Sequence, residues 1–69
     1  MRDTHYIVWS EHETEWVCYF HVRYGQGRAA RRRLTATVAF AKPLGHVSTP
    51  DLLRALAQAY DTKFGHLHQ

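Results

Sequence analysis

The chain has 69 residues but only one cysteine and two prolines, and it lacks long apolar runs. A single cysteine excludes an internal disulfide, so no covalent cross-link can stabilise the monomer. No apolar run approaches the roughly 20 residues of a membrane-spanning helix, and no apolar segment follows a basic N-terminus as in a signal peptide. Repeats and low-complexity segments are also absent. We therefore expect one small domain, residues 1–69, in the reducing cytoplasm and without a membrane segment.

Acidic residues are outnumbered, and the charges are unevenly distributed. Nine Lys and Arg stand against six Asp and Glu, which gives a formal net charge of +3. Five arginines cluster around one predicted strand connection: Arg23, Arg28, Arg31, Arg32 and Arg33. Arginine binds phosphate and carboxylate groups in a planar, bidentate geometry, which favours an anionic partner. A codon bias toward arginine would explain the excess over lysine equally well, but it explains the clustering less well.

Two segments alternate between apolar and polar residues with the period of a β-strand. They run from Glu15 to Tyr24 and from Arg31 to Ala41, and a loop containing Gly25 separates them. The apolar residues occupy even positions in both segments: Trp16, Cys18, Phe20, Val22 and Tyr24, then Leu34, Ala36, Val38 and Phe40. Alternate residues of a strand share one face, so these side chains are expected to point inward.

A further strand is predicted over residues 4–10, which are rich in β-branched and aromatic side chains. The inward face of this strand stays open, because both alternating sets are apolar. One set contains Ile7 and Trp9, and the other contains Tyr6 and Val8.

A helix is predicted over residues 50–64. Ser48 or Thr49 can cap its N-terminus, and Pro50 suits the first turn. The helix places six apolar residues on one face: Leu52, Leu53, Leu56, Ala57, Tyr60 and Phe64. Residues 65–69 are expected to form a frayed tail.

Together these segments predict an α+β fold, a three-stranded antiparallel β-meander (β-β-β-α) with one C-terminal helix packed on one face of the sheet. The strands are expected at about residues 4–10, 15–24 and 31–41. A single helix covers one face only. The other face must then be solvated or occupied by a partner.

The odd positions of the two alternating segments define this uncovered face. The candidate binding residues are Tyr19, His21, Arg23, Arg31, Arg33 and Thr35 on the strands and Arg28 in the loop. Because antiparallel partners share a face, Arg23 is expected opposite Arg31 or Arg33. Opposed like charges are destabilising unless they splay into water or hold an anion. In this interpretation the arginines hold phosphates, Tyr19 stacks on a base, and His21 and Thr35 make polar contacts.

We therefore predict a small, basic, non-enzymatic binding module whose partner is nucleic acid, either DNA or RNA. The alternative is a larger protein partner, such as a host protein that a phage-type inhibitor blocks, or a homodimer formed through the open sheet face. No cofactor or metal is predicted, because the six histidines lack the spacing of a zinc site. No catalytic residue is predicted either, since Cys18 is expected to point inward and His21 outward.

Two families share parts of this outline. The order of three strands and a helix resembles the DNA-binding modules of phage and transposon integrases, which insert a sheet face into the major groove. Val47-Ser-Thr-Pro50 replaces their Gly-Phe-x-Thr stretch. Residues 34–38 and 48–54 resemble the end of HicA-type toxin ribonucleases, whose first helix and Gly-Ser-His-His stretch are absent here. Neither resemblance includes the family's motif, so no family is assigned.

Overall fold

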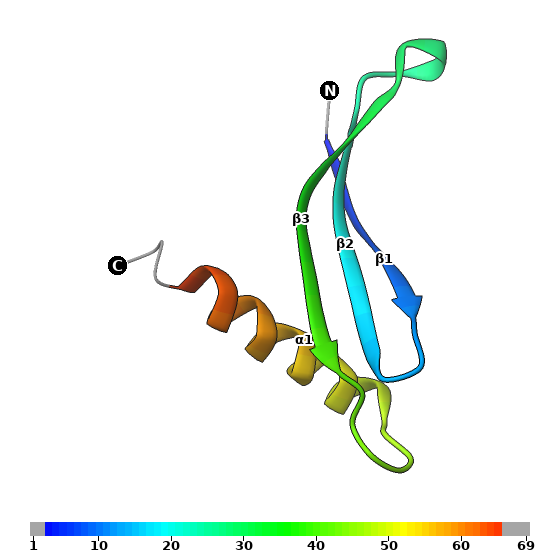
Figure 1. The fold of residues 1–69 in the computed structure, drawn as a ribbon. Coiled ribbons are helices and arrows are strands. Elements are labelled where there is room, and N and C mark those ends of the chain that lie inside the picture. Colours follow the sequence, from blue (N-terminus) through cyan, green and yellow to red (C-terminus); the bar gives the residue numbers. More distant parts are fainter. Residues whose placement is uncertain (1–2, 66–69) are drawn as a thin grey trace.

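The computed structural model describes residues 3–65 and contains three antiparallel strands followed by one helix (Figure 1). The elements are β1 (Thr4–Glu11), β2 (Glu15–Tyr24), the short 3-10 helix η1 (Gly27–Ala29), β3 (Arg31–Ala41) and α1 (Thr49–Phe64). The strand order is β1-β2-β3. The predicted α+β arrangement is confirmed. The predicted tail lies outside the described residues from position 66 onward. Within residues 3–65 no helix has both the length and the apolar composition to cross a membrane.

The pairing of β1 with β2 resolves the inward face of the first strand. Ile7 lies opposite Phe20, and Trp9 lies opposite Cys18. Cross-strand partners share a face, so Ile7 and Trp9 point to the side of the sheet that carries the helix. Tyr6 and its neighbour two residues on, Val8, therefore lie on the opposite face.

The core is small. Among residues 3–65, four apolar side chains are buried: Cys18, Val22, Val38 and Leu56. Leu56 of α1 contacts Cys18 and Val38, and partly buried aromatic side chains, including Trp9 and Phe40, surround this cluster. Burial raises the pKa of the Cys18 thiol, so Cys18 stays protonated and unreactive at neutral pH.

Helix α1 lies across one end of the sheet, and the β2–β3 hairpin extends well beyond it (Figure 1). Leu56 is buried and Ala59 packs beside it, whereas Leu53 is 50% exposed and Tyr60 is 36% exposed. The apolar face was expected to meet the sheet through Leu53, Leu56, Tyr60 and Phe64; Leu56 and Phe64 pack in the core, but the expectation is wrong for the exposed Leu53 and Tyr60. A helix presents only a narrow line of residues to a three-stranded sheet, so the rest of a wide apolar stripe remains outside.

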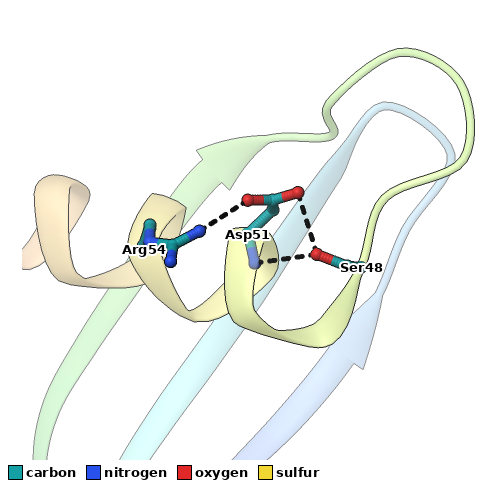
Figure 2. Close-up of polar contacts among 3 residues, drawn as sticks. All are labelled: Ser48, Asp51 and Arg54. Carbon is teal, nitrogen blue, oxygen red and sulfur yellow. Dashed lines mark hydrogen bonds and ion pairs between the residues drawn. The ribbon is translucent and has the colours of Figure 1, made fainter.

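The N-terminus of α1 is capped by a compact polar cluster (Figure 2). Ser48 Oγ accepts a hydrogen bond from the Asp51 amide at 3.3 Å and donates one to Asp51 Oδ2 at 2.8 Å. Arg54 donates to Asp51 Oδ1 at 2.8 Å. Of the two predicted caps, Ser48 is the one used. Because Asp51 also lies in the positive field of the helix N-terminus, its charge adds to the stabilisation.

We expect Ser48→Ala to lower the free energy of unfolding by about 1 kcal/mol, because the Asp51 amide loses its acceptor. In a domain of this size that loss lowers the melting temperature by about 4–8 °C, which thermal denaturation followed by circular dichroism would measure. Thr49→Ala is the matched control and should change the melting temperature little. Equal effects of the two substitutions would contradict the assignment of the cap.

Candidate functional site

The pairing of β2 with β3 contains a β-bulge that changes which β3 side chains share a face. Phe20 lies opposite Ala36, but the next residue of β2, His21, lies opposite Leu34. Thr35 therefore has no cross-strand partner, and its Oγ1 donates a hydrogen bond to the Phe20 carbonyl oxygen at 3.1 Å. Because side chains alternate along a strand, the extra residue inverts the face of every β3 residue that precedes it.

The predicted placement of Arg31 and Arg33 on the open face is therefore wrong. Arg33 lies opposite Val22, and Arg31 lies opposite Tyr24, which puts both at positions of the helix side of the sheet. The bulge is the physical reason, since without it the odd-numbered residues of β3 would share a face with the odd-numbered residues of β2. Thr35, also predicted on that face, is the bulged residue itself and uses its hydroxyl within the sheet.

Arg32 and Leu34 occupy the open face instead. Arg32 lies directly opposite Arg23, so the predicted pair of opposed arginines exists with a different partner. Leu34 was expected in the core, but it lies opposite His21 and is 50% exposed. The bulge thus removes two predicted arginines, Arg31 and Arg33, from this face and adds Arg32 and an apolar side chain, Leu34.

The open face is the side of the sheet away from α1. Its central residues form three cross-strand rows: Thr4, Arg23 and Arg32; Tyr6, His21 and Leu34; and Val8, Tyr19 and Thr37. The predicted residues Tyr19, His21 and Arg23 are all on this face. Three of the seven candidate residues therefore share the open face, and their neighbours there include residues that were not predicted, such as Tyr6, Arg32 and Leu34.

Two aromatic rings stack at the centre of the open face. Tyr6 and His21 lie opposite each other, with ring centroids 5.1 Å apart and planes inclined by 13°. His21 Nδ1 is buried and has no hydrogen-bond partner among residues 3–65. Tyr6 was not a predicted site residue, because the composition of β1 left its facing open. The alternation of β1 alone carries no signal that could have found it.

A basic hollow lies beside this stack, where the sheet meets the β2–β3 loop. It is lined by Thr4, Tyr6, Arg23, Gly27, Ala30, Arg31 and Arg32. The loop that closes the hollow depends on Gly25, which has φ of +87° and where a Cβ would lie 2.8 Å from the Ala29 carbonyl oxygen. Arg31 reaches the hollow from the end of its strand. The predicted residue Arg28 is exposed in η1 and does not line it.

The positive charges near this hollow have no counter-ion in the part of the chain that the structure describes. We call this region the arginine end: Arg23, Arg28, Arg31, Arg32 and Arg33. The ion pairs found within residues 3–65 join Lys42 to Glu11 at 2.6 Å and Arg54 to Asp51 at 2.8 Å. Neither involves the arginine end, so its charge is available to an external anion.

Groups for metal binding or nucleophilic chemistry are not assembled in the described residues. No three His, Cys, Asp or Glu side chains within residues 3–65 lie close enough to hold a metal ion. Cys18 is fully buried on the helix side of the sheet, and His21 lies on the open face. What the open face does assemble is arginine side chains and aromatic rings.

No family model matches this chain, and neither a curated protein nor a solved structure shows significant similarity to it.

Proposed function

We propose that this protein is a non-enzymatic module that binds nucleic acid through the open face and the arginine end. The main observation in support is the hollow. Three arginines line it beside an aromatic stack, and none of them is paired with a described carboxylate. Phosphate groups and bases are the two chemical parts of a nucleic acid, and this surface offers a complementary group for each.

Arg23 and Arg32 are the proposed phosphate clamp. Their direct opposition across β2 and β3 is unfavourable in the free protein, because like charges repel. An anion between them removes this repulsion and accepts charge-assisted hydrogen bonds from both guanidinium groups. Arg31 also lines the hollow, and in this proposal Arg28 in the adjacent loop contacts a neighbouring phosphate.

Tyr6, His21 and Tyr19 supply the proposed surface for bases. Tyr6 both lines the hollow and stacks on His21, so a nucleotide whose phosphate occupies the hollow has an aromatic ring within reach. Bases stack on protein side chains only when they are not stacked within a duplex. We therefore expect single strands to bind more tightly than duplexes.

Fluorescence anisotropy with labelled single-stranded DNA, RNA and duplex DNA tests this proposal. Contacts to three phosphates should weaken single-strand binding about 20-fold between about 50 and 200 mM salt, because bound counterions are released. Binding that shows this salt dependence supports the proposal and identifies the preferred strand type.

Two results would contradict the proposal. The first is no binding to any of the three at low salt, which would leave the open face, with its exposed Val8 and Leu34, to a protein partner. The second is affinity that does not change with salt, since phosphate contacts then contribute nothing.

A further inference from the structure

The chain exposes more surface than a folded monomer of its mass. It has 5761 Å² of accessible surface, whereas a monomeric protein of 8.1 kDa has about 4,500 Å². Its radius of gyration is 14.3 Å, compared with about 11 Å for a compact domain of this length. The excess of about 1,300 Å² exceeds the roughly 800 Å² that each partner of a standard protein interface buries.

Part of this surface is an apolar groove between α1 and the sheet, on the face opposite to the open face. It is lined by Phe20 of β2 and, from the helix, by Leu53, Leu56, Ala57, Tyr60 and Asp61. Leu53, Ala57 and Tyr60 are exposed and follow one another at helical spacing. Tyr60 packs on Phe20 with ring centroids 5.2 Å apart, which makes the sheet and the helix one continuous surface. Among the described residues, Asp61 is the only charged one that lines the groove.

We propose that a second copy of this chain covers the groove, with the two α1 helices packed antiparallel about a two-fold axis near Ala57. A two-fold interface uses the same patch on both copies, so each patch must be complementary to itself. This patch has an apolar stripe for mutual burial and the small Ala57 at the crossing point, where the helix backbones approach. The proposal does not depend on what binds the open face.

Charge complementarity selects a second copy over an unrelated partner. Arg54 and Asp61 are seven residues apart on the exposed side of α1. In an antiparallel pair whose axis passes midway between them, each Arg54 lies level with Asp61 of the other copy. The geometry therefore creates two symmetry-related ion pairs along one edge of the apolar stripe, one on each side of the two-fold axis, as in coiled-coil interfaces.

Arg54 can form an ion pair with Asp61 of the second copy and keep its hydrogen bond to Asp51 within its own chain. Its side chain is 76% exposed, and one guanidinium nitrogen donates to Asp51 Oδ1. The guanidinium carries five N–H donors, so the remaining donors are free to meet a second carboxylate. In each copy, an arginine held by Asp51 is thus oriented before association.

Sedimentation equilibrium of the full chain tests the proposal. We expect a dimer of micromolar or tighter dissociation constant, so that the mass at about 100 µM is twice that of the monomer. Leu53→Glu should raise the dissociation constant at least about 100-fold, because it places a carboxylate in the apolar stripe. Leu44→Glu is the matched control, since Leu44 is 99% exposed in a loop outside the groove and should leave association unchanged.

A charge exchange tests the antiparallel arrangement without relying on Leu53. Arg54→Glu and Asp61→Arg should each weaken association about tenfold, and the double variant should return to within about threefold of the parent chain. Far-UV circular dichroism confirms that each variant is folded. A monomer at every concentration overturns the proposal, as does a dimer that Leu53→Glu leaves intact. Single charge variants that the double variant fails to rescue would overturn the two-fold arrangement.

Discussion

Replacing Arg23 and Arg32 together by alanine is expected to weaken single-strand binding by about 100-fold or more. A hydrogen bond to a charged group contributes about 1.5–3 kcal/mol, and both side chains line the same hollow. Their loss also removes two positive charges from the arginine end. Anisotropy titrations at about 50 mM salt would measure the change, and the salt dependence of binding should become shallower.

The same double variant should be at least as stable as the parent chain. Arg23 and Arg32 lie directly opposite each other, and removing either one relieves a repulsion in the free protein. Thermal denaturation of the unbound variant checks this expectation. A loss of binding without a loss of stability would show that these arginines serve the ligand and not the fold.

Arg33, the residue next to Arg32, provides the control for the effect of net charge on binding. Arg32→Ala and Arg33→Ala each remove one arginine from adjacent positions of β3, but only Arg32 lines the hollow. We expect the first substitution to weaken binding about tenfold and the second by less than about threefold. If both weaken it equally, binding depends on net charge, and the proposed clamp is wrong.

Leu56→Ala is expected to leave the isolated chain largely unfolded at 25 °C. Truncating a buried leucine costs about 2–5 kcal/mol through lost burial and the cavity that remains. A single core in a domain of this length rarely supplies more than about 3–5 kcal/mol, so one such substitution removes most of the stability. Urea denaturation followed by far-UV circular dichroism would show the loss directly.

Leu53→Ala is the control for Leu56→Ala. It truncates the same side chain three residues earlier in α1, outside the core. Because Leu53 is half exposed, its truncation should cost less than about 1 kcal/mol when measured below the dissociation constant of the proposed dimer. Equal costs for Leu53 and Leu56 would mean that α1 packs on the sheet by a different face. The contrast therefore tests the orientation of the helix independently of any ligand.

The parts of the fold that could be predicted from the sequence are those that burial determines. The alternation of β2 is reliable because Cys18 and Val22 are buried, and the start of α1 is marked by local chemistry at Ser48. Where one face of a strand is buried, a shift of one residue would expose the core, so the pattern specifies the register. The central pairing of Cys18 with Val38 follows from this.

The start of β3 could not be predicted for the opposite reason. Arg31, Arg32 and Arg33 are consecutive and exposed, so neither alternating set is favoured for the inside. The even-numbered residues of β3 point inward at Val38, but the bulge at Thr35 reverses this on the other side of it. Leu34 is apolar and even-numbered, so it wrongly indicated that the inward set continued. Both alternating sets of β1 are apolar, so the sequence did not show that Tyr6 lies on the open face. The sequence alone therefore indicated which end of the sheet carries the arginine cluster, but the residues that share a face there required the observed register.

The separation of charge along the molecule has a consequence for how it meets a partner. Glu13 and Glu15 lie by the turn between β1 and β2, at the end of the sheet remote from the β2–β3 loop, in a molecule with a longest extent of 43 Å. This arrangement is an electric dipole along the strands. In the field of a polyanion it turns the molecule so that the arginine end leads, before any contact forms. Such orientation accelerates productive encounter, and salt reduces the acceleration by screening the field.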